Sequence, residues 1–379
     1  MLTVSNQSKP MATCYMSTAD LIVRDEVWRL LADFRLPDSL GFGEVSAPVM
    51  FSALYEDGRW STGELMPYGP IELLPGARAL HYAELVFEGL KAYRFGGASV
   101  NLFRARENYL RLHRSAERIA MSPVPEELFF KALHGLAGIC APIVPARSGQ
   151  SLYLRPFLFG TEPGYFVRSS KTARFMVIAN PVQAYAAGPM SVVVEREQVR
   201  AAKGGVGSAK TGANYAASLL ASTRAVQRGF TVAMWLDPVS RQNIEELSGM
   251  NFFAVLGNEL HTPSLVDSIL PGVTRDSLLR LSRDVGLRVV ERSMPIDELL
   301  QQISSGQCTE VFASGTAAIV APIRLIADAD GRVFRPRALD VRARELRERL
   351  LAIQERREPD PFGWVTEVAP LTRQDIASG

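Results

Sequence analysis

The chain has 379 residues, 47% of them hydrophobic and 22% charged, and its formal net charge is +2. This length exceeds the size at which one hydrophobic core stops growing, so we expect two domains. The small net charge gives no reason to expect nucleic-acid or membrane partners, and it favours a small-molecule substrate.

Targeting and metal-binding signals are both missing from the sequence. The N-terminal region has no basic segment followed by an apolar core, and no apolar run approaches the roughly 20 residues that span a bilayer, so we predict a cytoplasmic protein. Cys14, Cys140 and Cys308 are widely spaced and are not combined with the four histidines at ligand spacing. We therefore expect neither a metal site nor a disulfide scaffold.

The first half of the chain predicts helices beside antiparallel strands. Short apolar runs alternate with turn signals from Val49 to Leu85, and Phe87 to Arg94 continues this strand pattern. Apolar residues recur at three- and four-residue steps over Arg106 to Met121, which predicts a helix. Further helices are expected over Asp20 to Phe34 and Glu126 to Cys140, and strands over Ser151 to Gly160 and Ala173 to Ile178. This grouping is typical of an α+β fold.

Small residues over 184–189 predict an interdomain linker. We accordingly expect an N-terminal α+β domain over 1–183 and a C-terminal domain over 190–379. In the second part we predict helices at Asn214 to Arg228, Thr274 to Val285 and Val341 to Arg356. Strands are predicted at Ser191 to Val194, Thr231 to Leu236, Arg241 to Glu246, Asn251 to Leu256, Glu259 to Thr262, Leu287 to Val290, Glu310 to Ala313 and Ala317 to Ile326.

A glycine-rich turn at Lys203 to Ala221, KGGVGSAKTGANYAASLLA, delivers Lys210 to the start of a predicted helix. Its first part nearly matches the phosphate loop of nucleotide hydrolases, but Ala209 stands where that motif has its second glycine. The segment before Gly204 is polar and does not read as the buried strand that such a loop follows. These observations disfavour a P-loop nucleotide-binding protein. Two interpretations are left, a solvated turn and a lysine that anchors an aldehyde cofactor.

Six segments, taken in order, resemble the branched-chain amino-acid aminotransferases, which are fold-type IV (class IV) pyridoxal-phosphate enzymes. They are HYAELVFEGLKAYRF at 81–95, SLYLRPFLFGTEPG at 151–164, GGVGSAKTGANYAASLL at 204–220, EELSGMNFF at 245–253, LPGVTRDSLL at 270–279 and FASGTAA at 312–318. The resemblance implies a two-domain architecture with pyridoxal 5'-phosphate in the interdomain cleft. It also implies a homodimer in which a loop of the partner helps to close the substrate pocket.

The resemblance assigns Lys210 as the catalytic amine, which holds the cofactor as a Schiff base and shuttles a proton. It places Tyr215 at the ring hydroxyl and Glu246 at the ring nitrogen, while strand alternation turns Glu245 to the other face. The phosphate is assigned to Arg111, Val273, Thr274 and Thr316, although Arg104, Arg106, Arg114 and Arg118 are alternatives for the arginine. The Val273 and Thr274 N–H groups begin a predicted helix, where an anion is favoured.

For the substrate, the resemblance assigns the α-carboxylate to Tyr82 and to the backbone of Thr316 and Ala317, and it places Phe87 in the same pocket. Arg155 matches the arginine that recognises the side-chain carboxylate of glutamate. It follows Tyr153 by two residues on a predicted strand, so strand alternation puts both side chains on one face. Tyr153 and Arg155 are therefore expected to lie together beside the substrate.

Three positions depart from the family pattern. Ser46 replaces an aromatic residue, Tyr165 stands where a small aliphatic residue is common, and Ala186 replaces the aromatic residue of a Gly-Ala-Tyr-Phe run. These changes predict a reshaped side-chain pocket, either less selective or fitted to a bulkier oxo acid. The Cys-x-x-Cys redox switch of some members is absent, since residues 318–321 read AIVA.

The expected activity is transamination between a branched-chain L-amino acid and 2-oxoglutarate by a ping-pong mechanism. The alternative is an aminotransferase for a bulkier aromatic or β-substituted 2-oxo acid, for example a β-methylated one. The D-amino-acid and aminodeoxychorismate-lyase relatives fit the motifs at 245–253 and 270–279 less well.

Overall fold

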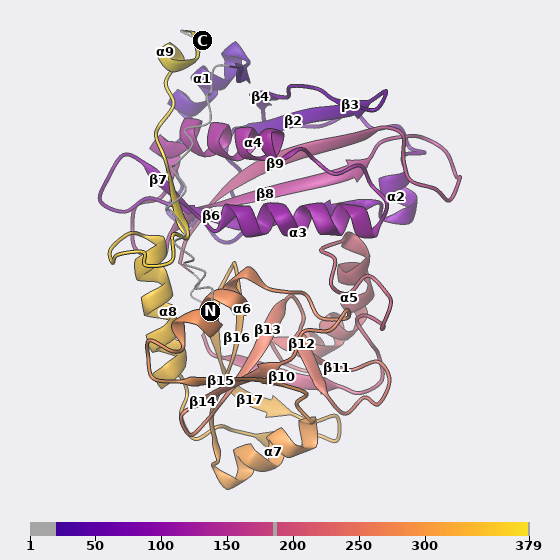
Figure 1. The fold of residues 1–379 in the computed structure, drawn as a ribbon, viewed down its shortest axis with the longest axis vertical. Helices are drawn as coiled ribbons and strands as arrows, with labels where there is room; N and C mark the ends of the chain where they lie inside the picture. Colours follow the sequence, from indigo (N-terminus) through magenta and orange to yellow (C-terminus); the bar gives the residue numbers. More distant parts are fainter. Residues whose placement is uncertain (1–19, 185–187, 378–379) are drawn as a thin grey trace, which may run out of the picture.

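The computed structural model describes residues 20–184 and 188–377, which form two separate sheets with helices on their faces (Figure 1). The first sheet has the strand order β1-β4-β2-β9-β8-β6-β7-β19, with β3 paired to β2 and β5 to β8. The second has the order β12-β11-β10-β17-β16-β13-β14-β15, with β18 paired to β17. This combination of helices and sheets confirms the α+β fold class expected from the sequence.

The first sheet is built around β8 (Ser151–Gly160) and β9 (Ala173–Val182), which pair antiparallel over their whole length. Its other strands are β1 (Ile22–Val23), β2 (Val49–Glu56), β3 (Arg59–Trp60), β4 (Glu64–Pro67), β5 (Leu85–Phe87), β6 (Leu90–Tyr93), β7 (Val100–Phe103) and β19 (Val365–Val368). Its helices are α1 (Asp25–Asp33), α2 (Arg78–Tyr82), α3 (Ala105–Arg118), α4 (Glu126–Ile139) and the 3-10 turn η1 (Ala141–Ile143). One large core joins α3 and α4 to the sheet. The helix α3 lies on the side of the sheet that faces the second sheet (Figure 1).

The second sheet is mixed, because β10 pairs parallel with both β11 and β17 while the remaining long strands pair antiparallel, apart from β15. Its strands are β10 (Met190–Glu195), β11 (Val232–Leu236), β12 (Ile244–Leu247), β13 (Met250–Leu256), β14 (Glu259–Pro263), β15 (Arg288–Arg292), β16 (Cys308–Gly315), β17 (Ile319–Ala327) and β18 (Val333–Phe334). Its helices are α5 (Gly212–Gln227), α6 (Val273–Leu281), α7 (Ile296–Ser305) and α8 (Val341–Gln354), whereas α9 (Arg373–Ala377) lies beside α1 of the first sheet. Residues of α7 pack on one face, and residues of α6 and α8 pack on the other.

Most predicted elements are present within a few residues, and two predictions about strands are wrong. The strand expected from Phe87 to Arg94 is broken into β5 and β6. Glu88 still donates its N–H to the Pro156 carbonyl, but Glu88 and Gly89 have no paired residue on β8, and Glu88 is fully buried. The strand expected from Arg241 begins only at Ile244, since Asp237 holds the preceding turn through the backbone N–H groups of Ser240 and Asn243. Helix α2 lies in the Val49 to Leu85 stretch, for which only strands were expected. Helices α7 and α9 and strands β18 and β19 were not anticipated.

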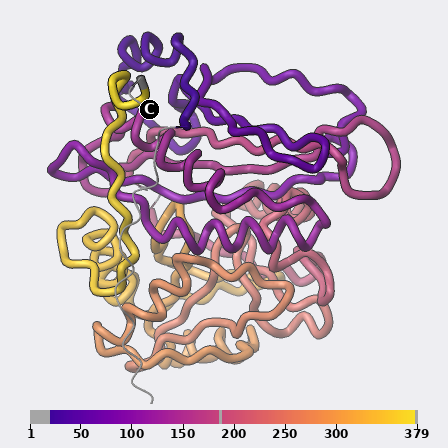
Figure 2. Tube along the Cα trace, turned by 45° about the horizontal axis from the view of Figure 1, so that its top comes forward, coloured from indigo at the N-terminus to yellow at the C-terminus, as the bar shows by residue number. Residues whose placement is uncertain are grey.

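The end of the chain returns to the first sheet. Strand β19 pairs antiparallel with β7, and Arg373 forms an ion pair of 2.6 Å with Asp25 of α1. Figure 2 shows this C-terminal segment running back along the first sheet to α1. Residues from about β19 onward therefore pack outside the second sheet, whereas the sequence placed all of 190–379 in one C-terminal domain. The domain division at 184–189 stays a prediction.

Two further features bear on the classes considered above. Among the helices of residues 20–184 and 188–377, none is long and apolar enough to cross a membrane. The same residues contain no cluster of three or more His, Cys, Asp or Glu side chains able to hold a metal ion.

Candidate active site

The backbone at Lys210 is held by the first sheet, although the residue begins an element of the second. Phe87 N–H donates to the Lys210 carbonyl at 2.9 Å, and Lys210 N–H donates to Ser115 Oγ at 2.9 Å. Thr211 Oγ1 donates to the Leu85 carbonyl at 2.7 Å. Contacts from β5 and α3 thus fix the lysine where the two sheets meet.

The Lys210 amine lies against two aromatic residues that the sequence assigned to the site. Its Nζ donates to the Tyr215 hydroxyl at 2.9 Å and lies 5.0 Å from the centroid of the Phe87 ring. The rings of Phe87 and Tyr215 are themselves 4.9 Å apart. A lysine held in this way is half-buried and directed, which the interpretation as a solvated turn does not explain.

Glu246 lies on β12 with only 3% of its surface exposed, and it faces Arg200. Its Oε1 is 2.9 Å from Arg200 Nε, and its Oε2 accepts the Leu270 N–H at 3.1 Å. Burial raises the pKa of Glu246, while Arg200, the Leu270 N–H and Lys210 oppose that rise. Arg200 and the Leu270 N–H thus favour the ionised form of a buried carboxylate that lines the same pocket as Lys210.

Glu245 and Glu246 point to opposite faces of the strand as expected, but both are buried. Ser268 Oγ donates to Glu245, and burial raises the pKa of Glu245 to about 7 against the lowering effects of this bond and of Arg200. Arg200 was not expected from the sequence, because an arginine in the polar segment before the glycine turn has no recognisable spacing from the other site residues.

Lys210 and Glu246 line the same pocket. Its lining comes from α5, β12, β13 and the turns beside them, and it comprises Arg200, Ala209, Lys210, Asn214, Tyr215, Ser218, Glu246, Gly249, Met250, Asn251 and Leu270. An amine and a tyrosine hydroxyl on one side, with a buried carboxylate on the other, are the donor set that a pyridine aldehyde requires.

Arg111 is the arginine of α3 that is buried beside the N-terminus of α6. It donates through Nη1 to the Pro271 carbonyl at 3.0 Å, and it makes a two-point ion pair with Glu88 at 2.6 and 2.8 Å. Asn108 also donates to Glu88 at 2.7 Å. Burial would raise the pKa of Glu88, but Arg111 and the hydrogen bonds outweigh it and hold that pKa below its usual value. The sequence did not identify Glu88.

The alternative arginines on α3 have other partners or stay at the surface. Arg104 pairs with Asp276 at 2.6 Å, and Arg118 donates to the carbonyls of Gly204 and Gly205. Arg106 pairs with Glu126 at the surface, and Arg114 is exposed. Arg104 also contacts the first turn of α6, but it does so through Asp276, Ser277 and the Val273 carbonyl. Arg111 instead reaches the Pro271 carbonyl just before the helix.

The phosphate donors proposed from the sequence lie around the start of α6 and the turn after β16. Val273 and Thr274 are the first residues of α6, and no side chain caps this helix, so its first N–H groups are available to an anion. Thr316 donates its hydroxyl to the Gly89 carbonyl at 3.1 Å. The Ala317 carbonyl accepts the buried Lys91 amine at 2.9 Å.

Tyr153 and Arg155 lie together as strand alternation predicts. Arg155 Nη2 donates to the Tyr153 hydroxyl at 3.0 Å, and its guanidinium lies 4.7 Å from the centroid of the Phe87 ring. A Cβ at Gly89 would collide with the Tyr153 hydroxyl, which explains the glycine there. Arg155, Phe87 and Lys210 thus form a continuous series of contacts.

The residues that depart from the family pattern do not contact Lys210 directly in the part of the chain that the structure describes. Ser46 Oγ accepts from Asn180 Nδ2 at 3.2 Å, and no ring stands at that position. Four residues earlier, however, Phe42 packs edge-on against Tyr153 with centroids 5.0 Å apart. Sequence reasoning missed this aromatic wall because it compared Ser46 alone. Ala186 lies outside the described residues.

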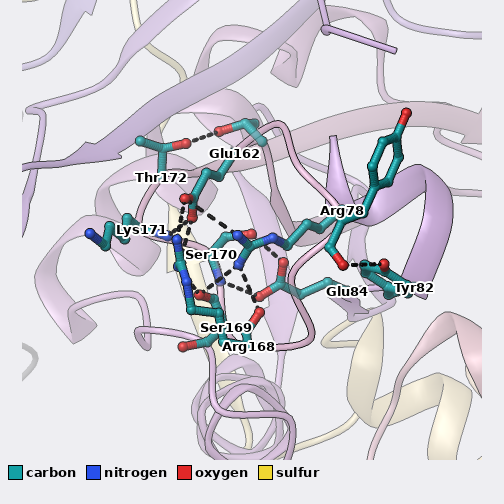
Figure 3. A network of polar contacts seen from close by, with 11 residues as sticks. Arg78, Tyr82, Glu84, Glu162, Arg168, Ser169, Ser170, Lys171 and Thr172 are labelled. Atoms are coloured by element: carbon teal, nitrogen blue, oxygen red, sulfur yellow. Dashed lines mark hydrogen bonds and ion pairs between the residues drawn. The ribbon is translucent and has the colours of Figure 1, made fainter. Parts of the chain in front are cut away.

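Tyr82 and Tyr165 contact each other rather than Lys210. The Tyr82 hydroxyl donates to the Tyr165 carbonyl at 2.8 Å, and both side chains are exposed. Within residues 20–184 and 188–377, no hydrogen bond or ring contact joins them to Lys210, Phe87 or Tyr215. Figure 3 shows the network of polar contacts that includes Tyr82.

That network fixes the loop after β8. Glu162 pairs with Arg168 at 2.6 Å and accepts the Lys171 N–H at 2.6 Å, while Glu84 accepts the Ser170 N–H at 2.7 Å. Arg78, which is fully buried, adds bonds to the carbonyls of Arg168 and Ser169. A loop held so firmly still exposes three apolar residues at its tip, Tyr165, Phe166 and Val167.

The fold and the site define an enzyme that uses a lysine to hold a phosphorylated pyridine aldehyde. The model of the amino-transferase class IV family matches residues 85–326. The chain is 45% identical over 339 residues to the branched-chain-amino-acid aminotransferase of Mycobacterium tuberculosis H37Rv, covering 86% of this chain and 92% of that protein. The corresponding Bacillus subtilis transaminase 1 is 41% identical over 344 residues, covering 88% and 95%.

Solved structures of branched-chain aminotransferases have the same fold as this chain. The branched-chain aminotransferase of Thermoproteus uzoniensis with norvaline superposes with a TM-score of 0.70 at 28% identity, over 84% of this chain and 99% of that chain. The T.th. branched-chain amino acid aminotransferase complexed with N-(5'-phosphopyridoxyl)-L-glutamate gives a TM-score of 0.69 at 27% identity, over 85% and 99%. This chain belongs to the class IV aminotransferase family. It is a pyridoxal-phosphate-dependent transaminase of fold type IV, as the motifs predicted, and the P-loop alternative is not favoured.

Proposed function

We propose that this enzyme transfers the amino group between a branched-chain L-amino acid and 2-oxoglutarate by a ping-pong mechanism. The observation that carries the proposal is the position of Arg155. Its guanidinium lies on the Phe87 ring, whose centroid is also 5.0 Å from Lys210 Nζ. The Arg155 Nε has no hydrogen-bond partner among residues 20–184 and 188–377, which leaves one donor of this guanidinium unused by the protein. A site with apolar walls and one such arginine suits both an aliphatic side chain and that of glutamate.

The residues described above would hold each part of pyridoxal phosphate. Lys210 would bind its aldehyde carbon, Tyr215 its ring hydroxyl and Glu246 its ring nitrogen. Arg111, Thr316 and the N–H groups of Val273 and Thr274 would hold the phosphate. When bound, the cofactor accepts the amino group and takes up the electron pair released at the substrate α-carbon.

The protein groups then have distinct tasks in the reaction. The Lys210 Nζ moves the proton at the substrate α-carbon, and Tyr215 holds that nitrogen in place through its hydroxyl. Glu246, paired with Arg200, supplies the negative charge opposite the ring nitrogen. The N–H groups of the Thr316–Ala317 turn orient the α-carboxylate, and Lys91 fixes that turn through the Ala317 carbonyl.

We also propose that the enzyme works as a homodimer in the cytoplasm, with two domains in each subunit. The support for a dimer is the stiff loop whose apolar tip is exposed, with Tyr165 71%, Phe166 70% and Val167 91% accessible. Such a tip is costly in water unless it is covered, and a second copy of this chain is the proposed cover. Tyr82 and Tyr165 would then serve the pocket of the second copy. Sedimentation of the wild type and of Phe166→Asp tests this, since a wild-type monomer contradicts it.

The bulkier-oxo-acid alternative was based on Ser46, Tyr165 and Ala186, and the change at Ser46 was read as the loss of a ring from the pocket wall. Because Phe42 occupies the same loop and packs on Tyr153, that observation no longer favours a wider pocket. Branched-chain substrates are therefore our proposal. The relatives in Mycobacterium tuberculosis and Bacillus subtilis carry that name and support it.

Absorption spectroscopy combined with a substrate panel tests this function. The purified protein should be yellow, and its visible band should shift when an L-branched-chain amino acid is added. The value of kcat/KM should be higher for leucine, isoleucine and valine than for phenylalanine and β-methylphenylalanine. Lys210→Ala should lose the cofactor link that borohydride traps in the wild type. Preference for the bulkier substrates would contradict the proposal.

A further inference from the structure

A short loop before β2 places one aromatic ring at the edge of the substrate site. Gly41 and Gly43 both adopt left-handed backbone conformations, with φ of +57° and +78°, and they flank Phe42. The Phe42 ring meets Tyr153 edge-on at 5.0 Å, yet 48% of this residue stays exposed. One side of the ring therefore contacts the site, while the other side has no close packing to hold it.

The loop is attached to the sheet next to β9. The Ala47 N–H donates to the Ala179 carbonyl at 2.8 Å. The side chain of Asn180 donates from Nδ2 to the Val45 carbonyl at 2.8 Å and to Ser46 Oγ at 3.2 Å. Since Asn180 is only 7% exposed, both amide protons are committed to this loop.

The sheet register puts this attachment beside the residues of the site. Asn180 on β9 is directly opposite Tyr153 on β8, and Tyr153 is directly opposite Lys91 on β6. Side chains directly opposite one another share a face of the sheet. Asn180, Tyr153 and Lys91 therefore form a row across one face of the sheet, with Tyr153 in the middle. Asn180 holds the Phe42 loop at one end of this row, next to the Tyr153 ring that Phe42 contacts.

We propose that Asn180 is a positioning residue for substrate selectivity. By fixing Val45 and Ser46, it presses Phe42 against Tyr153 and sets the width of the side-chain pocket, so that large aliphatic amino acids are preferred over small ones. The inference rests on the proposed transaminase function. Without the Asn180 donors, the two glycines let the loop move, and Phe42 no longer closes the pocket.

The test compares kcat/KM for leucine with that for alanine and 2-aminobutyrate. In Asn180→Ala we expect the leucine preference to fall roughly fivefold to tenfold, the effect of weakening one apolar pocket contact. The visible band of the cofactor and its affinity should not change. Asn180→Asp, which keeps the size but loses the donors, should act in the same direction. Ser46→Ala removes only the longer bond and should have a smaller effect.

A double-mutant cycle separates this role from a merely structural one. If Asn180 acts through Phe42, then Asn180→Ala should have no further effect on the leucine preference in the Phe42→Ala background. An equal effect in both backgrounds would overturn the proposal, and so would a uniform loss for all amino acids. If amino donors do not shift the visible band of the wild type, the proposed function itself fails. A different outcome overturns only the role of Asn180. In that outcome, amino donors shift the visible band of the wild type, but Asn180→Ala has the same leucine preference as the wild type.

Discussion

The guanidinium of Arg200 lies 2.9 Å from the carboxylate of Glu246. It also binds the two loops that lie beside this carboxylate. It donates to the Gly207 carbonyl at 3.2 Å and to the Ser268 carbonyl at 2.5 Å. Gly207 belongs to the turn that delivers Lys210, and Ser268 stands two residues before the Leu270 N–H that binds Glu246. One buried cation therefore sets the position of both the lysine and the carboxylate.

Arg200→Met should weaken cofactor binding and destabilise the enzyme without cofactor. Removing one partner of a buried ion pair costs about 3–5 kcal/mol, less where the remaining carboxyl takes up a proton. The free energy of unfolding from urea titration of the cofactor-free protein measures this, and reconstitution with pyridoxal phosphate measures affinity. Arg200→Lys should lie between wild type and Arg200→Met, because it keeps the charge and loses the planar fork. Unchanged stability and affinity in Arg200→Met would contradict the role.

Glu88→Gln should loosen Arg111 and lower stability at neutral pH by roughly 3 kcal/mol. The pKa of Glu88 lies below its usual value of 4.5 in the folded protein, so its contribution is present above pH 4.5 and is lost as pH falls through the folded pKa. The stability difference between wild type and variant should therefore shrink below pH 4.5. Urea unfolding at pH 7 and pH 4 checks it. Glu345→Gln, which breaks an exposed pair with Arg342, should cost under about 1 kcal/mol.

Lys91→Met should remove a pH dependence of stability. Burial, with the charge of Arg347, lowers the pKa of Lys91 from 10.5 to about 7. Between these values the unfolded chain binds more protons than the folded one, so wild-type stability should rise with pH by up to roughly 3 kcal/mol between pH 7 and 9.5. Burial raises the pKa of the neighbouring Tyr93, which keeps it neutral in this range.

Unfolding curves at pH 7 and 9.5 measure the effect, with the exposed Lys171→Met as the control. The rise should persist in the control and disappear in Lys91→Met. The same rise in both variants would mean that another group carries the pH dependence.

The sequence predicted those site residues whose chemistry is tied to a fixed place in a motif. Lys210, Tyr215 and Glu246 each hold a fixed place in a segment that resembles the family, and the resemblance assigned them. Glu88, Arg200 and Asn180 act through partners 23, 46 and 135 residues away in the chain, and no local pattern marks such a pairing. Strand β19 was missed for the same reason, because its partner β7 is more than 260 residues earlier.

Arg155→Leu should separate the two substrates of the reaction. The guanidinium has an unpaired Nε and rests on Phe87, so the loss should fall on the substrate whose side chain carries a carboxylate. We expect kcat/KM for glutamate to fall roughly 30-fold or more, as for one partner of a buried charged hydrogen bond. For leucine the change should stay under about fivefold, since only an apolar contact is altered. Half-reactions followed through the visible band measure each substrate alone. Arg155→Lys should recover part of the activity with glutamate, because it keeps the positive charge. An equal loss of kcat/KM for glutamate and leucine would show that Arg155 supports the pocket but does not bind the side-chain carboxylate.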